Sequence, residues 1–82
     1  MRIVSSRSAE KEILSLEKKL SQRIANKISL LENDPYPIGS KKLSDKEEYR
    51  IRIGDYRVVY SIDKKSKIIT IIKVKHRREI YR

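Results

Sequence analysis

The spacing of apolar residues changes along the chain and predicts which segments are helices and which are strands. Residues 1–6 are short and β-branched, as in a strand. From Ser8, apolar residues recur at helical spacing, and Ser8 is expected to cap this helix. The apolar stripe consists of Ala9, Ile13, Leu16 and Leu20. A second stripe over residues 24–31 predicts another helix with Ser21 as its cap; the two helices either form a hairpin or run together with a kink.

Proline ends the helical pattern, and a period of two follows it. Asp34-Pro35 stops the second helix because proline cannot continue it. Residues 37–46 are interpreted as a basic linker. Apolar and charged residues then alternate over residues 49–62 on either side of Gly54-Asp55, which predicts a two-residue β-hairpin. The segment "IITIIKV" is apolar on both faces and predicts a central strand.

These elements predict one α+β domain over residues 1–82. It has an N-terminal strand, a two-helix hairpin and a three-stranded antiparallel meander, with the helices packed on one face of the sheet. A chain of 82 residues has room for one hydrophobic core. No apolar run approaches the ~20 residues of a membrane span, and we see no signal peptide, so we expect a soluble, cytoplasmic protein. With no cysteine and one histidine, we expect neither a metal site nor a cofactor.

The two-residue loop also predicts which hairpin residues face each other. The expected pairs are Ile53 with Tyr56, Arg52 with Arg57, Ile51 with Val58, Arg50 with Val59, and Tyr49 with Tyr60. One face then carries tyrosines and aliphatic residues, and the other carries Arg50, Arg52 and Arg57. Like charges about 5 Å apart repel by roughly 0.8 kcal/mol in water and ~3 kcal/mol at an effective dielectric of 20. This cost is reasonable if a phosphate normally binds between the guanidiniums; the alternative is that they are simply solvated.

The charge of the chain is concentrated in its second half. The formal net charge is +10, and residues 41–82 carry 14 basic and six acidic side chains, a net of +8. Such an excess favours a nucleic acid or an acidic protein as partner. The Lys- and Glu-rich, Cys-free composition is typical of a thermophile. A thermophilic composition raises Lys and Glu together, so it does not explain the excess of basic over acidic side chains.

The C-terminal segment "KVKHRREIYR" extends the positive region. Its cations are Lys73, Lys75, Arg77 and Arg78. Tyr81 offers a ring that could stack on a base or anchor the C-terminus. His76 is either an ordinary exposed side chain or a group that transfers a proton near neutral pH.

The order of these motifs resembles a known group of proteins. The run "YRIRIGDYRVVYSI", the polar turn and hydrophobic strand after it, and the terminal "HRREIY" resemble the RelE/ParE superfamily of toxin–antitoxin toxins. The upstream helices and the "KKL" before the hairpin agree in order. The resemblance is strong over residues 42–81, and it is closer to RelE, in its archaeal form, than to ParE. It implies a RelE-like fold.

The resemblance to RelE also implies a function. RelE toxins are endoribonucleases that enter the ribosomal A site and cut mRNA through attack of a ribose 2′-hydroxyl on the adjacent phosphate, without a metal. The implied catalytic residues are Arg50, Arg52, Arg57, Arg77 and Tyr81. The implied substrate-binding residues are Lys42, Lys73, Lys75, His76 and Arg78. Lys75 or Arg78 could take the place of Arg77, because the alignment of the tail needs a small gap.

The sequence departs from this family at the first hairpin strand. The best-known members carry lysines there, whereas this chain has Arg50 and Arg52. Arginine stays protonated, so both residues can bind phosphate and stabilise negative charge but cannot act as a general base. The base would then be Tyr81, His76 or a ribosomal group. Because tyrosine ordinarily titrates near ~10, catalysis by Tyr81 requires a lowered pKa.

Two other functions remain open from the sequence. One is a ParE-like inhibitor of DNA gyrase without ribonuclease activity, and the other is a catalytically weak module that binds RNA or the ribosome. The resemblance also implies partners: a RelB-like antitoxin, acidic or amphipathic, and the ribosomal A site with its mRNA. Neither a membrane nor a small-molecule cofactor is expected.

Overall fold

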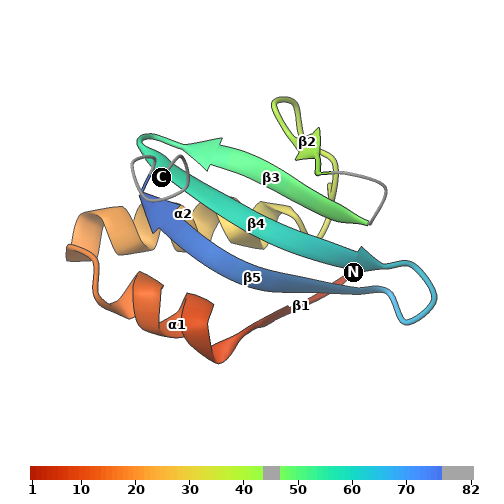
Figure 1. Ribbon diagram of the computed structural model, residues 1–82, viewed down its shortest axis with the longest axis horizontal. Helices are drawn as coiled ribbons and strands as arrows, with labels where there is room; N and C mark the ends of the chain where they lie inside the picture. The colour runs from red at the N-terminus through yellow and green to blue at the C-terminus, as the bar shows by residue number, and fades with distance from the viewer. Residues whose placement is uncertain (44–46, 77–82) are drawn as a thin grey trace.

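The computed structural model describes residues 1–43 and 47–76, which form two helices and one five-stranded sheet (Figure 1). In chain order the elements are β1 (Arg2–Ser5), α1 (Arg7–Leu14), α2 (Lys18–Leu30), β2 (Lys41–Lys42), β3 (Glu48–Ile53), β4 (Tyr56–Asp63) and β5 (Ile68–His76). Figure 1 shows α2 behind the central strands and α1 along the β5 side. The predicted α+β architecture, with a helical pair and an antiparallel meander, is confirmed.

The strands lie in the order β1-β5-β4-β3-β2. β1 pairs with β5 in parallel, and the other pairs are antiparallel. β5 therefore has a neighbour on each side, as its apolar sequence predicts. The predicted linker over residues 37–46 is wrong at Lys41 and Lys42, which form β2 and pair with Arg50 and Tyr49. Two residues are too few to show an alternating pattern, so this strand has no signature in the sequence.

Both helix caps differ from the expectation. Ser6, and not Ser8, caps α1, because its Oγ accepts a hydrogen bond from the Ala9 N–H at 3.0 Å. Ser21 lies inside α2, whose N-cap is Glu17 without a side-chain capping bond. The helices are separate, which confirms the hairpin alternative over the kinked helix. Neither helix in the described part of the chain is long and apolar enough to cross a membrane.

The hydrophobic core lies between the two helices and one face of the sheet. It consists of Ala9, Ile24, Ile28, Leu31, Ile51, Ile53, Val58, Tyr60, Ile62, Ile69, Ile71 and Val74. Tyr60 is fully buried, and its hydroxyl donates to the Pro35 carbonyl oxygen at 2.8 Å. The Tyr49 ring stacks on it with a centroid distance of 5.8 Å. These tyrosines hold the segment after α2 against the sheet, which fixes the position of β3.

Candidate nucleic-acid interface

The β3–β4 hairpin has the register that its turn predicts. All five expected pairs are present, from Ile53 opposite Tyr56 to Tyr49 opposite Tyr60. Gly54 has a φ of +60°, a conformation that a two-residue hairpin loop needs and that glycine adopts without strain. Successive strand residues point to opposite faces of a sheet. We call the face toward the helices the inner face and the opposite one the outer face.

Three cations lie opposite one another across the outer face. Arg52 of β3 faces Arg57 of β4, which in turn faces Lys75 of β5. Cβ atoms of directly opposed residues lie about 4.5–5.5 Å apart, so the three charges form one cross-strand row. The Lys75 Nζ also lies 2.9 Å from the Glu12 Oε2 of α1. This ion pair balances part of the charge at the α1 end of the row.

A second row runs beside the first. Lys41 of β2 faces Arg50, Arg50 faces Val59, and Val59 faces Lys73. Four adjacent strands thus contribute the six cations of the two rows: one from β2, two from β3, one from β4 and two from β5. The outer face therefore presents six cations over a small area, which suits the backbone of a nucleic acid.

A bulge in β5 aligns the lysines with the arginines. Tyr60 pairs with Ile71 and Val59 pairs with Lys73, so Ile72 is an extra residue without an opposite partner in β4. The Ile72 carbonyl oxygen instead accepts a hydrogen bond from the Ser6 hydroxyl at 2.8 Å. In a regular strand Lys73 and Lys75 would face the helices, and the bulge turns them to the outer face.

The cations of the outer face differ in exposure. Arg57 is buried, with only 7% of its surface exposed, whereas Arg52 and Lys73 are exposed. Arg52 Nε donates to the Gly54 carbonyl oxygen at 3.0 Å, which restrains the side chain near the turn. Arginine is the cation best suited to a desolvated position, because its guanidinium is weakly hydrated and keeps its proton. Arg57 is thus the fixed member of the row, with exposed cations around it.

Two predicted binding residues lie apart from these rows. Lys42 faces Tyr49, an inner-face residue, and its Nζ lies 3.6 Å from Glu47 Oε1. His76 faces Tyr56, also on the inner face, and the two rings make an edge contact at 5.2 Å. Lys41, which the sequence interpretation did not name as a binding residue, is the β2 lysine that faces Arg50. Because this segment was interpreted as a linker, the sequence did not predict which of the two lysines would point to the outer face.

The remaining predicted residues, Arg77, Arg78 and Tyr81, lie outside the described residues. Within residues 1–43 and 47–76, the side chains of His, Asp and Glu form no group that could hold a metal ion.

The tyrosines at the hairpin are held in their protonated form. Burial, with a hydrogen bond donated to Glu47 Oε2 at 3.0 Å, raises the pKa of Tyr49 to about 12. Burial likewise raises the pKa of Tyr60 to about 12. Neither residue can accept a proton near neutral pH. The described part of the outer face supplies charge and hydrogen-bond donors, groups that are suited to stabilising an anion electrostatically.

Together the fold and this face define a small α+β protein that presents ordered cations on one side of its sheet. Residues 3–81 match the family model of the ParE toxin of type II toxin–antitoxin systems, parDE, and the chain belongs to this family of the RelE/ParE superfamily. It is accordingly a toxin of a type II toxin–antitoxin system. No curated protein sequence matches it.

Solved structures of RelE proteins are similar to this chain. RelE in the archaeal RelE–RelB complex from Pyrococcus horikoshii OT3 is 35% identical, with a TM-score of 0.78 and 93% of each chain covered. RelE in the RelB–RelE complex from Methanococcus jannaschii is 23% identical, with a TM-score of 0.76 over 95% of this chain and 94% of that one. The isolated E. coli RelE toxin is 21% identical, with a TM-score of 0.81 over 98% and 89%. At 23% and 21% identity, the similarity to the M. jannaschii and E. coli proteins shows a shared fold and nothing more.

Proposed function

We propose that this toxin is a ribosome-dependent endoribonuclease that cuts mRNA in the A site and so inhibits translation in the cytoplasm. The observation that carries the proposal is the pair of cation rows on the outer face, in a member of the RelE/ParE superfamily. A bound mRNA phosphate would relieve the repulsion between Arg52 and Arg57. Binding of mRNA would thus restore part of the folding free energy that the repulsion between these arginines costs the free protein.

In the proposed reaction a ribose 2′-oxygen attacks the adjacent phosphorus. The new O2′–P bond forms as the P–O5′ bond breaks, which yields a 2′,3′-cyclic phosphate and a 5′-hydroxyl. The 2′-hydroxyl proton passes to a base, and the departing 5′-oxygen receives a proton. Arg50, Arg52 and Arg57, completed by Arg77, bind the phosphate and stabilise the charge that grows on its oxygens.

Arginine cannot serve as the base in this scheme. We propose Tyr81 or a ribosomal group. His76 is the weaker candidate because it pairs with Tyr56 on the inner face, across the sheet from the arginines. The cations around the phosphate would lower the pKa of a tyrosine placed beside it.

The test is cleavage of a defined mRNA on purified ribosomes, mapped by primer extension. We expect Arg52→Ala to slow cleavage by about 100-fold or more, because it removes a charged donor from the reacting phosphate. Lys65→Ala removes one positive charge from the exposed β4–β5 turn and is the matched control, expected to cut at the wild-type rate. Intact mRNA with the wild-type toxin, or full activity of Arg52→Ala, would contradict the proposal.

A second candidate function is inhibition of DNA gyrase. It is favoured by the matching family model, which is that of the ParE toxin. A supercoiling assay separates the two: inhibition of gyrase by a toxin that leaves ribosome-bound mRNA intact would replace the ribonuclease with this function.

We also propose a RelB-like antitoxin as the partner of the toxin. Similar chains have been solved as RelE–RelB complexes, including the archaeal one at 35% identity. A net charge of +10 favours an acidic or amphipathic chain that covers the outer face. Co-purification of the toxin with the small protein encoded beside it tests this partner.

A further inference from the structure

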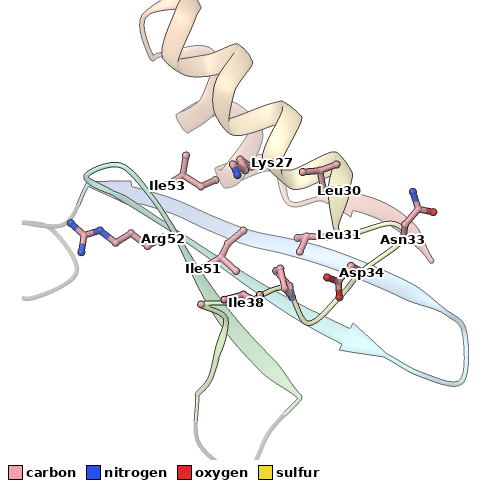
Figure 2. Close-up of a pocket in the computed structure, with 11 residues that line it drawn as sticks. Lys27, Leu30, Leu31, Asn33, Asp34, Ile38, Ile51, Arg52 and Ile53 are labelled. Atoms are coloured by element: carbon pink, nitrogen blue, oxygen red, sulfur yellow. The ribbon is translucent and has the colours of Figure 1, made fainter.

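A groove lies between α2, the segment after it, and β3. Its volume is about 410 Å³, and Figure 2 shows the side chains that line it. Leu30 and Leu31 come from the end of α2, Ile38 from the following segment, and Ile51 and Ile53 from β3. We call this the α2–β3 groove. Its size is that of a site for a few side chains.

The α2–β3 groove combines a buried floor with an exposed apolar rim. Leu31, Ile51 and Ile53 are buried and belong to the hydrophobic core. Leu30 is 60% exposed and Ile38 is fully exposed, so two aliphatic side chains border the opening from opposite sides. A contiguous apolar surface of this kind on a small protein indicates a binding site for another apolar surface.

The rim of the groove on the α2 side is positively charged. α2 has the sequence KKLSQRIANKISL, with four basic residues and no acidic one. Lys27 lines the groove, and the Arg23 Nη1 reaches within 3.6 Å of the position that a Cβ on Gly54 would take, at the hairpin turn. Asp34 is the acidic residue among those lining the groove. The charge therefore favours an occupant with aliphatic side chains and acidic neighbours.

The lining favours protein over RNA as the occupant. Single-stranded RNA binds by phosphate contacts and by stacking of its bases on aromatic rings. The described residues that line the groove include no aromatic side chain, and the floor is aliphatic. Aliphatic side chains of a peptide fill such a space and remove Leu30 and Ile38 from water.

We infer that the α2–β3 groove anchors an acidic, amphipathic segment of the cognate antitoxin, an inference that rests on the partner proposed above. Aliphatic side chains of this segment enter between Leu30 and Ile38, and its acidic side chains lie against Arg23 and Lys27. Ile51, Arg52 and Ile53 all line the groove, and in Figure 2 the Arg52 guanidinium extends away from the two isoleucine side chains. Arg50 and Arg57 are not among the residues that line the groove. Holding the antitoxin in the groove is therefore separable from covering these two cations.

The test measures the affinity of purified, full-length toxin variants for the full-length protein encoded by the neighbouring small gene. Leu30→Asp should weaken binding about tenfold or more, because it places a charge in the apolar opening. Leu14→Asp is the matched control: Leu14 ends α1 as Leu30 ends α2, is 82% exposed and lies outside the groove. Ile38→Asp, at a fully exposed position outside any helix, repeats the test where folding is not at risk.

The charge of the rim is tested by a second matched pair. Lys27→Glu should weaken binding and reduce its dependence on salt, because Lys27 faces acidic side chains of the bound segment. Lys11→Glu reverses the corresponding charge in the last turn of α1 and should bind as the wild type does.

Each groove variant is also tested for mRNA cleavage, which distinguishes this inference from the ribonuclease proposal. We expect Leu30→Asp and Ile38→Asp to cut mRNA at the wild-type rate and to escape neutralisation by the antitoxin. Equal affinity of Leu30→Asp, Ile38→Asp and wild type overturns the inference, as does absence of any wild-type binding, whatever the cleavage assay gives. Loss of cleavage or of toxin self-association in these variants, with antitoxin affinity unchanged, would instead assign the groove to RNA or to a second toxin copy.

Discussion

The two faces of the β3–β4 hairpin are built from alternate residues of the same strands, yet their energetics are opposed. On the inner face Ile51, Ile53, Val58 and Tyr60 are buried in the core. The outer face places Arg52 opposite Arg57, where like charges repel. Burial of the inner face stabilises the hairpin, and this stability offsets the repulsion between the cations of the outer face. Substitutions on the two faces should therefore change different measurements.

The largest expected effect is on the inner face. Tyr60→Ala should lower the free energy of unfolding by about 3–5 kcal/mol, because it leaves a cavity in the core and removes the hydrogen bond to Pro35. For a domain of 82 residues, with a total stability of roughly 4–12 kcal/mol, this is a large fraction. Urea denaturation measures it. Tyr60→Phe keeps the ring and should lose only about 0.5–1.5 kcal/mol; equal losses for both variants would mean that packing is not the cause.

The next effect separates activity from stability on the outer face. Arg50→Gln should reduce mRNA cleavage about 10- to 100-fold, since it removes a cation from the second row. Its free energy of unfolding should stay within about 0.5 kcal/mol of the wild type, because Arg50 is not part of the core. A loss of stability that accounts for the lost cleavage would break the proposed division between the faces.

Alkaline pH tests the inner face through Tyr49. Its pKa is raised to about 12 in the folded protein, above the ordinary value of 10, so folding favours the protonated ring. The resulting stability is fully present below pH 10 and is lost as the pH rises through 10 to about 12. Chemical denaturation at several pH values should show a smaller loss over this window for Tyr49→Phe than for the wild type. The same slope in both proteins would exclude Tyr49 as the titrating group.

The smallest effect concerns repulsion on the outer face. Lys73→Gln should raise the free energy of unfolding by about 0.2–0.5 kcal/mol at low salt, because the exposed Lys73 lies in the row of Arg50 and Lys41. The gain should disappear near ~0.5 M salt, where exposed charges are screened. Lys65→Gln, in the β4–β5 turn, serves as the control. A destabilised Lys73→Gln would show that the row is not under repulsion.

The sequence predicted the hairpin in detail because its turn leaves little freedom. Gly54-Asp55 fixes the loop length, the loop length fixes the register, and strict alternation then assigns every side chain to a face. The same logic failed for Lys42, since β2 has only two residues and its pairing with β3 depends on tertiary contacts. The cap of α2 was misplaced because Leu16 and Leu20 continue the helical spacing of the first stripe across the break between α1 and α2.

Other features of the site are non-local, and no short pattern encodes them. The parallel pairing of β1 with β5 joins opposite ends of the chain, and the β5 bulge is recognised only from its partner strand. The alignment of Lys75 with Arg57 depends on this bulge. Charge composition identified the half of the chain that carries the basic face, but it could not show that Lys41 and Lys73 lie in one row with Arg50.

The extra residue in β5 also affects how relatives should be compared. A homologue that lacks a counterpart of Ile72 could pair regularly with its β4 and still present its lysines on the same side of the sheet. Such a sequence would be one codon shorter yet equivalent in function, whereas an ungapped alignment would match its cations with the wrong positions of this chain. Length variation at this point of the gene is therefore compatible with the same row of cations, and substitutions inferred across it should be counted only after a gap has been placed at Ile72.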